Sequence, residues 1–417
     1  MQRIRHLLCA FAVLCALAVL CPSAEARIKI IKKDAYSSLR AQTGGGAGPS
    51  LTSVGKKPAG AQAKTLSVTA TSEVFTWYSS TPNNQSTAEN AYIILHGINR
   101  NAHTYFDILN KVLANASDAG LTGAGLNTTV SVAPLFFSAA RDSAALNRTT
   151  LGWGDPSEWV GGDASTHPHG SDLSVFTVLD AMLQNFTDQK AYPAMKRVTF
   201  LAHGAGAQVL QRYAVLGEKS SSCKVAVRYV IGDPSSMLHF TRDRPEAVDT
   251  TSCSVYNDFR YGFSNYRSPY PLSTTPQGLF ERYLARDVRY IIGGNDTRED
   301  KGDQLCAGRA MGGSSRSDRS LNYWAYLHLL SGSTKVPEYP GLYETLDPVK
   351  AKRCKIEGGC STGSTSKGTR PVSTNAELAE FKTSVKLAHQ FFVVPGAKHN
   401  ASTILGSSQG QAAIFGS

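Results

Sequence analysis

The chain has 417 residues, 41% of them hydrophobic, which is enough for one large α/β core with insertions or for two modest domains. Its formal net charge is +11, but the lysines and arginines form no basic stripe with interleaved aromatic residues, which argues against a nucleic-acid partner. The cysteine and histidine spacings match no zinc site, and the sequence predicts neither a metal nor a cofactor.

The first 26 residues have the pattern of a secretory signal peptide, with two arginines near the start, an apolar run over 7–21 and a cleavage site at Ala24-Glu25-Ala26. The apolar run is short for a membrane span, so we expect a secreted protein with no span after cleavage; an uncleaved signal anchor is the alternative. Residues 27–65 are basic and then rich in Gly, Ser, Ala and Lys, which predicts a flexible leader before a domain over 66–417.

The cysteines and the glycosylation sequons fit a secreted chain. Three of the eight cysteines would leave with the signal segment. Of the other five, we expect Cys253 to pair with Cys306 and Cys354 with Cys360, leaving Cys223 free, although spacing alone allows other pairings. Sequons of the form N-x-S/T, where a eukaryotic secretory pathway adds glycans, occur at Asn84, Asn115, Asn127, Asn147, Asn185, Asn295 and Asn400.

Apolar segments in chain order predict a mostly parallel sheet. From Leu66 the segments LSVTAT and VFTWYSS alternate as two antiparallel strands. Continuous apolar runs, typical of strands covered on both faces, follow at 91–95, 129–133 (ended by Pro134), 198–201, 225–231, 288–292 and 390–394. Helices are expected at 104–114, 172–183 (capped by Ser171 or Asp172), 207–214 and 321–330. Because parallel neighbours need crossover connections, this alternation predicts an α/β fold.

Three segments lack a clear period. Residues 138–172 contain Trp153, Trp159 and several glycines, and we expect a long loop over the strand ends. Residues 238–280 are rich in aromatic and turn residues, which indicates a cap or lid insertion. Residues 331–376 are rich in Gly, Ser, Thr and Lys and are expected to form a second, irregular insertion.

The segment RVTFLAHGAGAQVLQRYAVL, residues 197–216, changes from a strand period to a helical period across a five-residue turn. An α/β-hydrolase holds its nucleophile in such a turn, in the pattern G-x-S-x-G. Here the turn runs from Ala202 to Gly206, and the serine position is Gly204. A purely structural turn and a phosphate-binding turn are the other interpretations, but the third glycine of G-x-G-x-x-G would fall at Val209.

Five motifs at strand ends occur in one order along the chain: LHGINRNAHTYF at 95–106, FLAHGAGAQVLQRYA at 200–214, VRYVIGDPSSM at 227–237, RDVRYIIGGNDT at 286–297 and VVPGAKHN at 393–400. Together they resemble the α/β-hydrolase superfamily, in particular its secreted bacterial and fungal esterase-like and lipase-like members, over about residues 66–410. The resemblance implies the α/β-hydrolase fold, a mostly parallel central sheet with helices on both faces and a cap insertion.

The resemblance also implies roles for individual residues. His399 resembles the general base, and Asp296 resembles the carboxylate that orients the imidazole and stabilises its charged form. With Gly204 they follow the family's chain order of nucleophile, acid and histidine. Asp233 also ends a strand and is the alternative acid.

The implied oxyanion hole consists of backbone N–H groups of Ala205 and of the loop that begins at His96, Gly97 and Ile98. The departure from the family is at Gly204, which has no oxygen to attack an acyl carbon. Removing the serine of a hydrolytic triad costs about six orders of magnitude in kcat. We therefore expect a pseudo-hydrolase that binds an ester-like small molecule, a lipid or a glycan.

Two other functions are compatible with the sequence. In the first, His399 activates water across the vacant turn, and the protein slowly hydrolyses carboxylic esters without a covalent intermediate. In the second, the aromatic insertion at 238–280 binds glycans, lipids or another surface, and the fold is only a scaffold.

Overall fold

The computed structural model describes residues 48–155, 157–218, 224–245, 248–333, 381 and 383–416. The predicted signal segment, most of the predicted leader, most of the 331–376 insertion, and Cys223, Cys354 and Cys360 lie outside the described residues. Within the described part of the chain, no helix combines the length and the apolar character that a membrane span requires.

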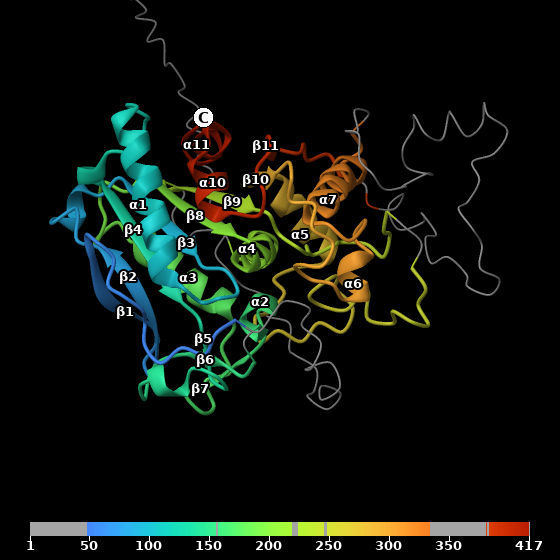
Figure 1. Ribbon diagram of the computed structural model, residues 1–417, viewed down its shortest axis with the longest axis horizontal. Helices are drawn as coiled ribbons and strands as arrows, with labels where there is room; N and C mark the ends of the chain where they lie inside the picture. The colour runs from blue at the N-terminus through green and yellow to red at the C-terminus, as the bar shows by residue number, and fades with distance from the viewer. Residues whose placement is uncertain are drawn as a thin grey trace, which may run out of the picture.

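An eight-stranded sheet forms the centre of the molecule (Figure 1). In spatial order its strands are β1 (Ala61–Thr69), β2 (Ser72–Ser79), β4 (Thr129–Leu135), β3 (Asn90–Leu95), β8 (Arg197–His203), β9 (Ala226–Gly232), β10 (Asp287–Gly293) and β11 (Gln390–Val394). β2 is antiparallel to both β1 and β4, and all neighbours from β4 to β11 are parallel. The prediction of a mostly parallel sheet with an antiparallel start is confirmed.

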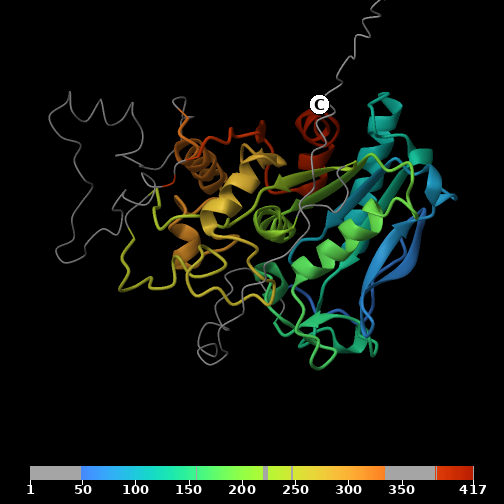
Figure 2. The same ribbon diagram turned by 180° about the vertical axis from the view of Figure 1, so that it is seen from behind.

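Helices cover both faces of the sheet, as Figures 1 and 2 show from opposite sides. One face carries α1 (Ala102–Asp118), α10 (Ala401–Gly406) and α11 (Ser408–Phe415), and the other carries α3 (Val175–Thr187), α4 (Ala205–Leu216), α5 (Pro276–Leu284) and α7 (Arg316–Leu330). Successive residues of β3 therefore enter different cores: Ile93 packs with the α3 and α4 side, and Ile94 with the α1 side. Burial on both faces explains the continuous apolar runs of the central strands.

Some element boundaries differ from the predicted ones. β1 begins at Ala61, inside the predicted leader, because Ala61 already pairs with Ser79, the last residue of the antiparallel strand β2. Pro134 lies within β4 instead of ending it; β3 stops pairing with β4 at Val132, so a proline two residues farther on is tolerated as it is at a sheet edge. The helix expected from 172 begins at Val175, capped by the side chain of Ser174.

The segment expected to be a long loop over 138–172 has regular structure, so that expectation was wrong. It is part of a small sheet of β5 (Phe137–Ser138), β6 (Gly152–Trp153) and β7 (Ser165–His167), and it includes the short helix α2 (Glu158–Gly161), which contacts α4. Trp153 and Trp159 are fully buried and pack against Phe136, one edge-on and one tilted, with ring centroids 5.7 and 5.6 Å from its ring. Burial of these large aromatic side chains is what orders the segment.

Candidate functional site

Gly204 joins the end of β8 to the start of α4 and has backbone angles φ 65° and ψ −120°. This conformation is strained for any residue with a Cβ but is freely available to glycine. Gly206, two residues later, is needed for packing, because a Cβ there would lie 2.5 Å from the carbonyl oxygen of His96. The sharp strand-to-helix turn therefore has the geometry of a nucleophile elbow, with glycine at its apex.

Two side chains from neighbouring strand ends face this turn. Asp296 follows β10 and His399 follows β11, and His399 Nδ1 lies 2.8 Å from Asp296 Oδ2. The other ring nitrogen, Nε2, lies 3.1 Å from the position that a Cβ of Gly204 would occupy. The structure thus brings Gly204, Asp296 and His399 together in the arrangement of a hydrolytic triad that lacks its nucleophilic oxygen.

Asp296 is almost fully buried, and its second oxygen, Oδ1, accepts a hydrogen bond from Arg316 Nη1 at 3.1 Å. Burial alone would raise the pKa of Asp296, but the hydrogen bond with His399 and the charges of His399 and Arg316 lower it below its usual value. The carboxylate is therefore ionised at neutral pH, so Nδ1 of His399 donates the proton of their hydrogen bond. This leaves Nε2 as the ring atom that faces Gly204.

The pKa of His399 is lowered by burial, which outweighs the opposite effect of its hydrogen bond to Asp296. Electrostatic interactions with His203 and Arg316 lower this pKa further. A neutral imidazole whose Nε2 carries a free lone pair is the form that a general base requires.

Asp233, the alternative acid, lies after β9 and has a different partner. Its Oδ2 lies 3.2 Å from His203 Nε2, and its Oδ1 accepts the backbone N–H of Gly293 at 2.8 Å. Its distance to His399 Nδ1 is 3.8 Å, too long for a hydrogen bond. Asp296 is thus the acid that contacts His399, and Asp233 joins the ends of β8, β9 and β10.

The rings of His203 and His399 pack against each other, with centroids 4.2 Å apart. Ligating atoms of His203, Asp233 and His399 all lie within 4.8 Å of one another, a spacing that could hold a metal ion. In this structure His399 Nδ1 is hydrogen-bonded to Asp296 Oδ2, and His203 Nε2 lies 3.2 Å from Asp233 Oδ2. The two histidines are therefore held in two histidine–aspartate pairs.

The structure places three of the four predicted oxyanion-hole residues at the pocket and one outside it. Gly97, Ile98 and Ala205 line the pocket at the turn. His96 is fully buried and does not line the pocket; Nε2 of its ring accepts the N–H of Phe136 at 2.9 Å, and Nδ1 donates to the Gly97 carbonyl at 2.8 Å. The His96 side chain thus supports the loop through hydrogen bonds in the interior. Burial lowers the pKa of His96 to about 4.

A second buried group holds the same loop. Arg100, which has a positive φ of 52°, forms an ion pair with Asp142 in which Nε and Oδ2 are 2.8 Å apart and both side chains are fully buried. Asp142 also accepts the N–H groups of Leu51 and Ser138, each at 2.8 Å. The loop at 97–101 is therefore anchored to the chain segment before β1 and to the small sheet.

The pocket above Gly204 has a volume of about 990 Å³. Its lining includes the loop at 97–101, one side of α1, the turn, and the segment that follows His399. Arg260, Tyr261, Lys301 and Asp303 form another part of the wall. The walls are rich in polar and charged groups. Arg260 and Tyr261 belong to the 238–280 insertion, which therefore contributes to the pocket lining, while Tyr256, Phe259 and Tyr270 of that insertion are buried.

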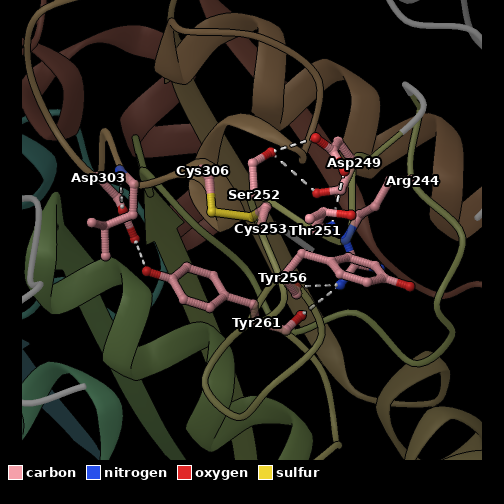
Figure 3. The surroundings of a disulfide bond; sticks show 10 residues. Arg244, Asp249, Thr251, Ser252, Cys253, Tyr256, Tyr261, Asp303 and Cys306 are labelled. Carbon is pink, nitrogen blue, oxygen red and sulfur yellow. Dashed lines mark hydrogen bonds between the residues drawn. A yellow bond between two sulfur atoms is a disulfide. The ribbon is translucent and has the colours of Figure 1, made fainter. Parts of the chain in front are cut away.

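A disulfide joins the two parts of this wall. Cys253 and Cys306 are bonded, with Cα atoms 5.8 Å apart, which confirms the predicted pairing. Figure 3 shows Tyr261 beside this disulfide, with its hydroxyl donating to Asp303 Oδ2 at 2.8 Å. Two cross-links, one covalent and one polar, thus hold the insertion against the segment that contains Lys301 and Asp303.

Sequence reasoning missed two residues of the site. His203 precedes Gly204 directly, so its place at the strand end could have indicated it. Arg316, at the start of α7, is separated from Asp296 by 20 positions in an irregular stretch of chain, and no local pattern indicates their contact.

Solved structures with a similar fold are hydrolases. They include poly(aspartic acid) hydrolase-1 from Sphingomonas sp. KT-1 (TM-score 0.51, 15% identity, covering 85% of this chain and 98% of that chain). Another is the poly(3-hydroxybutyrate) depolymerase LpqC from Bordetella parapertussis (TM-score 0.49, 14% identity, covering 85% of this chain and 90% of that chain). A third is the siderophore hydrolase EstB from Aspergillus nidulans (TM-score 0.36, 10% identity, covering 87% of this chain and 97% of that chain). No protein-family model and no curated protein matches the chain in sequence.

The strand order, the elbow and the similarity to poly(aspartic acid) hydrolase-1 define the class: the chain has the α/β-hydrolase fold, as predicted. At these identities the similarity concerns the fold alone, because one fold supports many functions.

Proposed function

We propose that this protein is a secreted α/β-hydrolase-like protein that has no serine nucleophile and binds an ester-like small molecule in the pocket above Gly204. The proposal rests mainly on the 3.1 Å between His399 Nε2 and the Cβ position of a residue that carries no side chain. A base and its orienting acid have nothing to deprotonate there. Without the attacking oxygen, the pocket retains binding but loses acyl-enzyme chemistry.

Secretion is supported by features outside and inside the described chain. The first 26 residues have the pattern of a signal peptide, and the Cys253–Cys306 disulfide is typical of an oxidising compartment. Of the seven sequon asparagines, all but the half-buried Asn185 are exposed and accessible to glycosylation. Expression in a eukaryotic host should therefore place the protein in the medium, with a mass that decreases on enzymatic removal of N-glycans.

The test of the proposed function is an esterase assay with p-nitrophenyl butyrate, combined with saturation-transfer NMR to detect bound ester. We expect saturable binding, and product release no faster than with heat-denatured protein or with the His399→Ala variant. Turnover by the native protein that is lost in His399→Ala would overturn the proposal.

A second candidate function is slow ester hydrolysis by water. Apart from the chain neighbours of Gly204, the only described residue with atoms within 4 Å of the Gly204 Cβ position is His399. This leaves space for a water molecule beside His399 Nε2. His399 would then remove a proton from water directly, and the rate would rise with pH as the imidazole loses its proton. Weak turnover that follows this pH profile, with no acyl-enzyme trapped at early times, would favour this candidate.

A further inference from the structure

The space beside Gly204 is the one part of the site that the proposed function leaves unexplained. In a serine hydrolase this space holds the serine Oγ. Here a Cβ at residue 204 would meet only Nε2 and Cε1 of His399, at 3.1 and 3.5 Å, among the described residues that are not its chain neighbours. The space belongs to the pocket, of which Gly204 and His399 are both lining residues.

Hydrogen-bond donors approach this space from two directions. Helix α4 begins at Ala205, and the N–H groups of a helix's first turn have no partners within the helix and carry partial positive charge. Ala205 and the loop residues Gly97 and Ile98 line the pocket on this side. On the other side, His399 Nε2 becomes a donor when the ring is protonated, because Nδ1 already donates to Asp296.

An ester offers these groups one carbonyl oxygen, whereas a carboxylate offers two oxygens and a negative charge. We propose that the pocket binds the carboxylate group of a free acid at Gly204, with one oxygen accepting from His399 Nε2 and the other from the N–H groups of Ala205 and the 97–98 loop. This inference rests on the proposed function, since it requires a pocket that binds without turnover. A serine side chain at 204 would occupy the space that the carboxylate needs.

The groups around His399 bear on its protonated form, which the proposed carboxylate contact requires. The ring is faced by His203 at the end of β8, Asp233 after β9, Asp296 after β10 and Arg316 on α7. Asp296 faces the Nδ1 side of the ring, and a bound carboxylate adds a negative charge on the Nε2 side, which faces Gly204. Binding therefore takes up a proton. The affinity should fall as the pH rises through the pKa of His399, by up to about tenfold per pH unit.

The test uses the full-length protein and hexanoate as the probe, with methyl hexanoate and inorganic phosphate as comparisons, measured by calorimetry and by NMR of the His399 ring. We expect hexanoate to bind at least about tenfold more tightly than either comparison at a pH of about 5.5, above the pKa of the acid itself. We also expect hexanoate to raise the pKa of the His399 ring. Equal binding of methyl hexanoate or phosphate, or no binding of hexanoate, would overturn the inference.

Variants locate the site. Gly204→Ala fills the space with a methyl group and should weaken hexanoate binding at least about tenfold, while His399→Gln should remove the pH dependence. Gly120→Ala is the matched control: that glycine also has a positive φ of 68°, its Cβ would meet nothing within 4 Å, and it lies outside the pocket. It likewise places a Cβ at a positive φ, and it should bind hexanoate normally.

The two proposals can fail separately. Binding of methyl hexanoate without turnover, and without a preference for hexanoate, would overturn only the carboxylate inference. Turnover of an ester that depends on His399 would overturn the proposed function. Hexanoate binding that is unchanged in Gly204→Ala would also overturn the carboxylate inference.

Discussion

His399 Nε2 lies 3.1 Å from the point at which a side chain on Gly204 would begin. This distance is short for a Cβ but close to what a serine presenting its oxygen to a histidine needs. The acid, the imidazole, the turn and the pocket are all in place around it. We therefore expect the absence of a hydroxymethyl group at residue 204 to be the main difference between this site and a hydrolytic one.

Gly204→Ser should introduce esterase activity. Loss of the serine removes most of the rate enhancement of a hydrolytic triad. We therefore expect the variant to release p-nitrophenol from p-nitrophenyl butyrate at least about a thousandfold faster than the native protein does. The positive φ should cost the fold about 1 to 3 kcal/mol, which thermal unfolding would measure. Gly204→Ala should lose similar stability and gain no activity. A folded serine variant that is inactive would contradict this prediction.

The choice of acid can be tested in the Gly204→Ser background. Asp296→Asn should lower kcat by about four orders of magnitude, because the amide no longer holds His399 in the required tautomer. Asp233→Asn should have a much smaller effect on kcat, since Asp233 lies 3.8 Å from Nδ1 and bonds to His203 instead. Steady-state kinetics of both double variants would show which acid matters, and the reverse order of effects would rule out our assignment.

Stability should depend on pH through His96. Burial lowers the pKa of His96 to about 4, whereas an unfolded histidine titrates near about 6.5. The unfolded chain therefore binds a proton that the fold excludes, so stability is complete above about pH 6.5 and decreases as the pH falls towards about 4. This contribution amounts to about 3 kcal/mol. Urea unfolding at several pH values should show that the free energy of unfolding falls less at low pH in His96→Gln than in the native protein. The same pH dependence in both proteins would contradict the prediction.

The Cys253–Cys306 disulfide should stabilise the protein mainly through the unfolded chain. Its cysteines are 53 residues apart, which corresponds to about 4 kcal/mol in the chain-entropy model. The variant with serine at both positions should unfold at lower temperature than the native protein. A reductant should lower the unfolding temperature of the native protein more than that of the variant, which retains the expected Cys354–Cys360 pair. A reductant that lowers both unfolding temperatures equally would contradict this prediction.

Asp142→Asn should destabilise the loop at 97–101. The variant leaves Arg100 buried without its counter-charge, which typically costs about 3 to 5 kcal/mol. The expected result is a lower unfolding free energy and faster amide exchange at Gly97 and Ile98, measured by hydrogen exchange. Exposed Lys196→Ala, which removes a surface ion pair with Glu89, is the control and should cost less than about 1 kcal/mol.

The strands and the parallel sheet could be predicted because they are recorded locally. A strand buried on both faces must be apolar along its whole length, so β3, β8, β9 and β10 are visible as short apolar runs. The turn at Gly204 and the cysteine pair were likewise indicated by neighbouring residues and by spacing. The order of the strands places their carboxyl ends side by side, which is why Asp296 and His399 meet.

Other features depend on contacts between distant segments, which no local pattern records. Asp296 and Asp233 both follow strands, and only the positions of those strands decide that His399 lies 2.8 Å from the first and 3.8 Å from the second. The aromatic residues of the 238–280 insertion have the composition of a lid, but their burial depends on the core beneath them. The sequence alone determined which residue stands at the apex of the turn; the tertiary structure decided what faces it, because hydrogen bonds and burial arise only when the chain is folded.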